Sequence, residues 1–330
     1  MKKNLINRRK FLDLAKLSFV FFITSCRGLT NKTTIGFHKK FIPDNLISSL
    51  PKNWIKKNIN FEDINLNKNI KNHDLIIIND GWLNKLRVKE FNDINSSLIN
   101  ILDKRSSDFL KYWDINERKK IYPIGIIPYV LVIKNNDYYK ISKSSSWDLL
   151  TKKEFKGKII LPNSTRILIS LAEKINNKNS IKALINQDNI YDDKNAIDWL
   201  VNTNAILAIM PISYCHRYLK FDSRLSLVFP DQGVPLIWNF LLINNDFNQQ
   251  KVIDWTKNLS NKNISNKLQS DGWYFPFNNN SSEEKYKFSQ ENKRFLIRPS
   301  EECWKNSWSL PPLKDAEKIK IEKLWKESLD

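Results

Sequence analysis

The chain has 330 residues, of which 41% are hydrophobic and 12% aromatic, a composition that excludes a disordered chain and allows a sizeable core. A formal net charge of +19 would ordinarily indicate nucleic acid or an anionic surface as partner. However, Lys and Arg are spread along the sequence without a block of five or six, so we expect a solvated basic surface and no nucleic-acid site.

The first 26 residues predict an export signal that is separate from the fold. A basic stretch that includes Arg8 and Arg9 precedes a short apolar run, residues 17–23, which is too short to span a bilayer. The run ends at Thr24-Ser25-Cys26, which resembles a bacterial lipobox and predicts Cys26 as the lipidated residue. The Arg8-Arg9 pair resembles a twin-arginine export signal. An uncleaved N-terminal anchor is the alternative, and both readings place the body of the protein outside the cytoplasm.

Neither a metal site nor a catalytic centre is expected from the sequence. Beyond Cys26 the chain has two cysteines, Cys215 and Cys303, whose spacing does not require a disulfide. There are three histidines, with no Cys-x-x-Cys or His-x-x-x-His spacing to indicate zinc. No Ser/His/Asp or Cys/His arrangement is evident, so we predict a binding protein without a cofactor and not an enzyme.

The first elements of the fold alternate between strand and helix. Residues 33–38 predict a strand, residues 41–50 a helix, and residues 73–80 the clearest strand. Asp80 and Trp82 stand at the end of that strand, where ligands bind in α/β sheets. We therefore predict both as ligand-binding residues, the alternatives being a helix cap for Asp80 and a surface anchor for Trp82.

The middle of the chain predicts a second α/β unit. Ser146 caps a short helix, and strands are expected over residues 158–161 and 205–210, with helices over 167–175 and 192–202. Tyr214 follows the second of these strands and is a further candidate for the ligand site. Beyond this unit, one long helix is predicted over residues 250–268, and a closing helix over 314–329.

Two uncharged apolar runs, Tyr122–Ile133 and Leu236–Ile243, bracket the second unit. Such runs are typical of strands that are buried on both faces. Two buried strands around an inserted α/β unit predict two lobes joined by a paired crossover. Trp238 and Asn239 lie in the second run, and we predict that both reach the cleft between the lobes.

The order of these motifs resembles the extracellular solute-binding proteins of ABC importers, specifically the spermidine/putrescine-binding branch. The resemblance covers nearly the whole chain after the export signal. Its segments are Ile35–Pro43, His73–Asp80, Ile121–Asn135, Trp147–Ile160, Leu207–Tyr214, Phe229–Ile243 and Asp271–Trp273.

The resemblance implies an α/β fold of the two-lobed periplasmic-binding type, in which each lobe is a sheet flanked by helices and two crossover strands join the lobes. We assign residues 33–127 and 244–330 to lobe 1, and residues 128–243 to an inserted lobe 2. It also implies that the protein binds a small solute between the lobes and delivers it to an inner-membrane permease. With the export signal, this predicts a periplasmic, lipid-anchored monomer.

The implied ligand is a polyamine such as spermidine or putrescine, which such sites hold with carboxylates and aromatic faces. One aromatic of the first loop in the family is kept as Phe41, which joins the candidate site residues. The family's acidic positions fall on Lys40 and Asn239, and its acidic stretch before a helix of the second lobe appears as residues 163–166. A neutral or anionic solute, or an envelope lipoprotein without a transport role, therefore remains an alternative.

Overall fold

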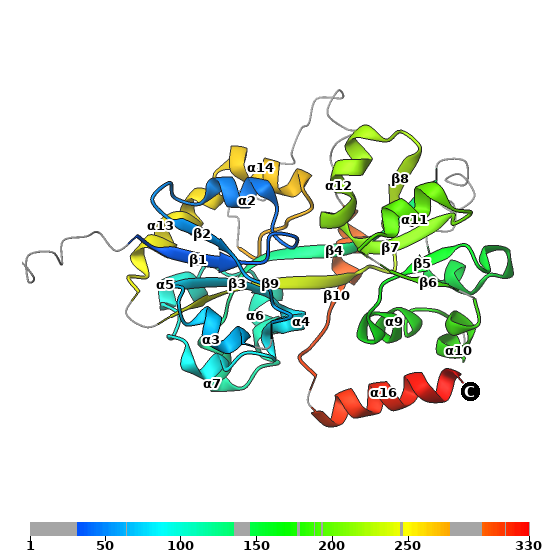
Figure 1. Cartoon of the computed structure of the whole chain (residues 1–330), viewed down its shortest axis with the longest axis horizontal. Helices are drawn as coiled ribbons and strands as arrows, with labels where there is room; N and C mark the ends of the chain where they lie inside the picture. Colours follow the sequence, from blue (N-terminus) through cyan, green and yellow to red (C-terminus); the bar gives the residue numbers. More distant parts are fainter. Residues whose placement is uncertain are drawn as a thin grey trace, which may run out of the picture. The chain divides into compact units, whose positions relative to one another are not determined.

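The structure is a computed structural model of mixed α/β architecture, shown in Figure 1. It describes residues 32–63, 65–134, 146–176, 179–187, 189–192, 194–244, 247–277, 299–313 and 315–329. The predicted export signal and Cys26 lie outside the described residues. No helix within the described ranges is both long and apolar enough to cross a membrane.

The strands form a sheet in the order β2-β1-β3-β9-β4-β7-β5-β6, with β10 paired to β9 and β8 paired to β4. We call β2, β1 and β3 the first sheet end, and β7, β5 and β6 the second sheet end. The strands are β1 (Thr34–Phe37), β2 (Ile55–Asn58), β3 (Leu75–Asn79), β4 (Tyr122–Lys134), β5 (Ile159–Leu161), β6 (Ile190–Tyr191), β7 (Leu207–Pro211), β8 (Leu225–Val228), β9 (Pro235–Ile243) and β10 (Trp308–Ser309).

Two long strands, β4 and β9, connect the two sheet ends (Figure 1). Residues 122–128 of β4 pair antiparallel with β9, and residues 129–134 pair with β7 and β8. The other edge of β9 pairs with β3. Nearly every residue of the two strands is buried, which is why their sequences are uncharged and apolar. The predicted pair of buried connecting strands is therefore confirmed.

Helices cover both faces of the sheet. At the first sheet end, α2 packs against α14, and the short helices α3 to α7 lie on the opposite side in Figure 1. At the second sheet end, α11 and α12 cover one face while α9 and α10 cover the other (Figure 1). The helices are α2 (Asp44–Ser49), α3 (Leu66–Ile70), α4 (Asp80–Leu83), α5 (Ser96–Ile99), α6 (Lys104–Leu110), α7 (Ile115–Arg118), α9 (Thr165–Ala172), α10 (Ser180–Ile185), α11 (Ala196–Asn202), α12 (Ile212–Phe221), α13 (Gln250–Leu259), α14 (Lys262–Ser270), α15 (Glu301–Asn306) and α16 (Asp315–Leu329).

One predicted helix is divided in the structure. The long helix expected over residues 250–268 is broken into α13 and α14 at Ser260 and Asn261. The Asn261 side chain accepts a hydrogen bond from the backbone N–H of Asn263 and so caps the start of α14. The apolar period continued through this break, so the periodicity alone predicted a single helix.

The C-terminal segment crosses to the second sheet end. Helix α16 packs against α9 and α10, with Trp325 edge-on to Tyr191 at 6.1 Å between ring centroids. The sequence-based assignment placed residues 244–330 in lobe 1, whereas these contacts are made with residues assigned to lobe 2. The lobe boundaries at 127–128 and 243–244 stay a prediction.

Candidate functional site

A cavity of about 1100 Å³ lies where the two connecting strands pass between the sheet ends. The first sheet end contributes Asn79 and the start of α4, and the second contributes the start of α9, the end of β6 and the start of α12. Strands β4 and β9 form part of the wall through Ile127 and Asn239. The cavity is thus built from segments that are far apart in the sequence.

Asp80 is the first residue of α4, directly after β3. The N-cap position belongs to Asn79, so Asp80 does not cap the helix and its carboxylate lies in the cavity wall. Burial raises the pKa of Asp80 to about 6, against the opposing influence of Arg166 and of the backbone N–H groups of Gly81 and Trp238. The side chain therefore changes charge close to neutral pH.

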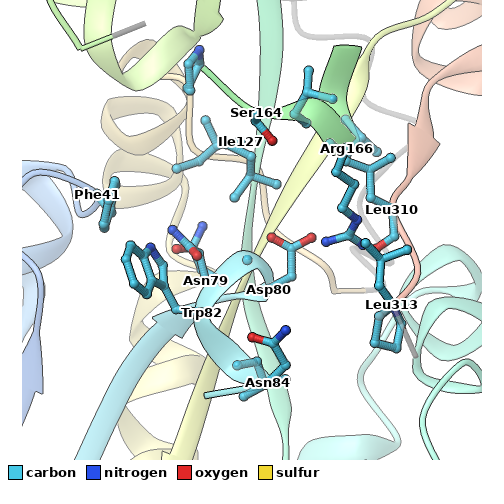
Figure 2. Close-up of a pocket in the computed structure, with 18 of the residues that line it drawn as sticks. Phe41, Asn79, Asp80, Trp82, Asn84, Ile127, Ser164, Arg166, Leu310 and Leu313 are labelled. Carbon is cyan, nitrogen blue, oxygen red and sulfur yellow. The ribbon is translucent and has the colours of Figure 1, made fainter. Parts of the chain in front are cut away.

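Arg166, in the first turn of α9, lies opposite Asp80, and the two side chains face one another in Figure 2. Its guanidinium donates hydrogen bonds to the backbone carbonyl oxygens of Leu310 and Pro311. Burial lowers the pKa of Arg166, while Asp80 acts in the opposite direction. Arg166 thus lines the cavity and is also hydrogen-bonded to the C-terminal segment. Leu313 of that segment lines the cavity as well.

Asn239, a residue of the cavity wall, has a buried and unsatisfied amide. The residue is 1% exposed, and neither its Oδ1 nor its Nδ2 atom has a hydrogen-bond partner among the described residues. The β3–β9 ladder places it opposite Asn79, which also lines the cavity. A buried polar group without a partner costs about 1–3 kcal/mol, so a ligand that bonded to this amide would recover that cost.

Aromatic rings line one side of the cavity. Phe41 and Tyr214 stack with ring centroids 6.4 Å apart, and Trp82 lies close by, with the Lys85 ammonium 4.2 Å from the centre of its ring. The same three aromatic residues border a second, smaller cavity of about 440 Å³. Lys40, which the resemblance placed near the ligand, lines this second cavity and not the larger one.

The Trp238 side chain does not line the cavity, unlike that of Asn239, and the role of Trp238 in binding stays a prediction. Its side chain is fully buried, stacks on Phe109 at 4.5 Å and donates from Nε1 to Ser309 Oγ at 2.8 Å. Successive side chains of a strand point to opposite faces, so Trp238 faces the core when Asn239 faces the cavity. The neighbour on the same face as Asn239 is Ile237, which does line the cavity.

Two further carboxylates lie on the wall near α7. Asp114 caps this helix by accepting from the backbone N–H groups of Asn116 and Glu117, and it also pairs with Lys89 at 3.7 Å. Burial, and then the nearby Asp114, raises the pKa of Glu117. A fourth acid, Asp192, is held by hydrogen bonds within its own turn.

The structure thus brings together five of the residues proposed from the sequence, namely Phe41, Asp80, Trp82, Tyr214 and Asn239. Their role in binding stays a prediction. Sequence reasoning did not name Asn79, Arg166 or Glu117 as site residues. Two of them carried a signal: Asn79 is adjacent to Asp80 at a strand end, and Arg166 belongs to residues 163–166, which the resemblance aligned with an acidic stretch of the family. Among the described residues, no group of three or more His, Cys, Asp or Glu side chains is arranged to hold a metal ion.

No protein-family model and no curated protein matches the sequence. Solved structures do match. The spermidine/putrescine substrate-binding protein PotD of Streptococcus pneumoniae has a TM-score of 0.67 at 15% identity, covering 91% of this chain and 99% of that chain. The PotD lipoprotein of Treponema pallidum has a TM-score of 0.60 at 9% identity, covering 90% and 98% of the two chains. The ferric binding protein of Campylobacter jejuni has a TM-score of 0.59 at 16% identity, covering 90% and 99%.

These likenesses extend over almost the whole length of each structure, and the sheet with helices on both faces agrees with the fold class expected from the sequence. The chain has the α/β fold of the periplasmic substrate-binding proteins of ABC transporters.

Proposed function

We propose that this protein is the substrate-binding component of an ABC importer and that it holds a small, amine-bearing solute in the larger cavity. The fold supports the binding role, because its neighbours include spermidine/putrescine-binding proteins. The observation that carries the proposal is the combination, in one cavity wall, of the Asp80 carboxylate, the unsatisfied Asn239 amide and a group of aromatic rings.

Each of these features suits an amine. A carboxylate forms a charge-assisted hydrogen bond with an ammonium, and aromatic faces attract the cation while they cover its methylene groups. Acids also outnumber bases along the wall. Asp80, Asp114, Glu117 and Asp192 stand against Arg166 and Lys194. The resulting field favours a ligand that carries positive charge.

A polyamine is the ligand that the family resemblance implies, and it is the first candidate to test. The wall residues Asn239 and Arg166 also favour a second candidate, a solute that is neutral overall, because both side chains offer donors that a polyamine does not need. A ferric binding protein is also among the structural neighbours, so proteins of this fold bind chemically different ligands.

The remaining expectations from the sequence complete the proposal. We infer that the chain is exported by a signal that includes its Arg8-Arg9 pair, and that Cys26 carries a lipid that holds the protein at the membrane surface. In this position a monomer would deliver its solute to an inner-membrane permease. An envelope lipoprotein without a transport role would share the fold and the anchor but would bind no small solute.

Thermal unfolding of the purified full chain, with and without millimolar putrescine or spermidine, tests the proposal. A ligand at a hundred times its dissociation constant adds about 2.7 kcal/mol to the free energy of unfolding, which raises the unfolding midpoint by a few degrees. The shift should be lost in Asp80→Asn and kept in Asp254→Asn, a matched change at an exposed residue of α13. A shift that Asp80→Asn leaves intact would remove Asp80 from the site, and no shift with any amine would refute the proposed ligand class.

A further inference from the structure

The cavity holds opposite charges that face one another without touching. Asp80 begins α4, directly after β3 of the first sheet end. Arg166 lies in the first turn of α9, at the second sheet end (Figure 2). Although the two side chains influence each other's charge, no hydrogen bond or ion pair of 4.0 Å or less joins them in the part of the chain that the structure describes. Each charge therefore still has room for a partner inside the cavity.

Two backbone carbonyl groups hold the Arg166 side chain in this position. Its Nη2 atom donates to the backbone carbonyl oxygens of Leu310 and Pro311, which leaves the rest of the guanidinium directed toward Asp80 (Figure 2). A guanidinium has five N–H donors in a rigid fork that matches the two oxygens of a carboxylate. Fixing one side of the fork with backbone carbonyls orients the remainder for such a group without supplying a competing negative charge.

A plain diammonium ligand does not satisfy this arrangement. One of its ammonium groups would pair with Asp80, but the nearby guanidinium would then have the same charge as the ligand and no partner. A ligand that carries both an ammonium and a carboxylate satisfies both residues. Asn239 is 1% exposed, and its amide has no partner among the residues that the structure describes, so it adds donor and acceptor groups to the same wall.

We propose that the ligand is a zwitterion of the amino-acid class, with its ammonium on Asp80, its carboxylate on Arg166 and a further hydrogen bond to the Asn239 amide. The inference rests on the proposed function and narrows its substrate class. It makes Arg166 the residue that decides between amino acids and diamines. The aromatic group formed by Phe41, Trp82 and Tyr214 is then available to cover the ligand's apolar part.

Titration calorimetry of the full chain with length-matched pairs tests the inference. Each pair keeps one ammonium and one alkyl chain and differs only in the second end group, as in putrescine against 5-aminopentanoate. The series runs from two to six carbons between the end groups, and alanine and ornithine represent α-amino acids. We expect at least one zwitterion to bind at least tenfold more tightly than the diamine of the same length.

Arg166→Gln should reverse that order, weakening the zwitterion at least tenfold and strengthening the diamine. Arg166→Lys keeps the positive charge and should restore part of the zwitterion affinity, which a purely structural role of Arg166 would not produce. The control is Arg224→Gln, since Arg224 pairs with Asp222 on the surface and does not line the cavity. Circular dichroism of each variant without ligand checks that the fold is kept.

The outcomes separate the inference from the function on which it rests. If diamines bind the parent chain more tightly than their matched zwitterions, and Arg166→Gln leaves the order unchanged, the zwitterion is wrong and the amine-binding function stands. If the folded chain binds neither series, both are wrong. If zwitterions bind but Arg166→Gln and Arg224→Gln weaken them equally, Arg166 does not recognise the carboxylate.

Discussion

Asn239 offers a direct test of the cavity as a site built for binding. Replacing it with leucine keeps the side-chain size almost unchanged and removes an amide whose two polar atoms are buried and have no hydrogen-bond partner in the described ranges. Because an unsatisfied buried polar group costs about 1–3 kcal/mol, Asn239→Leu should increase the free energy of unfolding of the ligand-free protein by that amount. In a chain of this size each kcal/mol corresponds to roughly 2 °C, so we expect the unfolding midpoint to rise by about 2–6 °C.

The same substitution should weaken ligand binding at least tenfold, because the hydrogen bond that recovers the cost of the buried amide is lost. Stability is measured by urea and thermal unfolding without ligand, and affinity by calorimetry. The matched control is Asn244→Leu, just beyond the end of β9. The amide nitrogen of Asn244 donates to the carbonyl oxygens of Ile70 and His73, so this change should destabilise the protein. If Asn239→Leu destabilises the protein as much as Asn244→Leu does, the Asn239 amide is already satisfied and the reasoning fails.

Three other predictions follow from the geometry. An ammonium group needs an ionised Asp80, whose pKa is raised to about 6. Ligand affinity should therefore be constant near pH 8 and about tenfold weaker at pH 5. An affinity that does not change between pH 5 and 8 would exclude Asp80 as the partner. Gly125→Ala should lower the free energy of unfolding, measured with urea, by about 1–3 kcal/mol, since the added Cβ would lie 2.0 Å from the Trp273 ring. A change near zero would show that Gly125 and Trp273 are loosely packed. Asp271→Ala should lower the free energy of unfolding by about 2–3 kcal/mol in the same assay, because the buried Asp271 carboxylate pairs with Lys220 at 3.3 Å. The exposed control Asp254→Ala should change it by less than about 0.5 kcal/mol, and an equally small change in Asp271→Ala would count against a structural role.

The proton linkage of Asp80 has a second, independent consequence for stability. Its pKa in the folded state lies above the ordinary value, so the folded protein binds this proton more tightly than the unfolded chain does. The stabilisation by that proton is present below the ordinary pKa and is lost as the pH rises through about 6. Asp80→Asn removes the titrating group, so the free energy of unfolding of this variant, relative to the parent chain, should be higher at pH 8 than at pH 4. Urea unfolding at the two pH values would measure this difference, and a difference that does not change with pH would contradict the raised pKa.

Much of the fold could be predicted from the sequence because local patterns report burial directly. The uncharged runs of β4 and β9 are typical of strands buried on both faces, and the structure pairs these strands with each other. Several shorter strands and helices were also correctly placed by periodicity, including β3, β7 and α9. The break between α13 and α14 was missed because a single capping asparagine interrupted the backbone without interrupting the apolar period.

The candidate site was only partly predictable, for a related reason. Residues at strand ends carry a positional signal, and this identified Asp80 and Trp82. The choice between Trp238 and Asn239 depended on which face of β9 turns to the cavity, and that is set by the pairing of β9 with β3 and β4. A tryptophan in an apolar strand has no local feature that distinguishes a cavity wall from a core, so the tertiary arrangement decided it.

The sequence by itself determined an α/β chain with two buried connecting strands and placed Asp80 and Trp82 at a strand end, because these follow from hydrophobic patterning along the backbone. It also predicts an export signal that ends at Cys26, a prediction that depends on local sequence alone. Only the tertiary structure brought Arg166 opposite Asp80 and fixed it through Leu310 and Pro311. These residues are separated by long stretches of sequence, and the charge balance of a cavity depends on distances in space that no local pattern encodes.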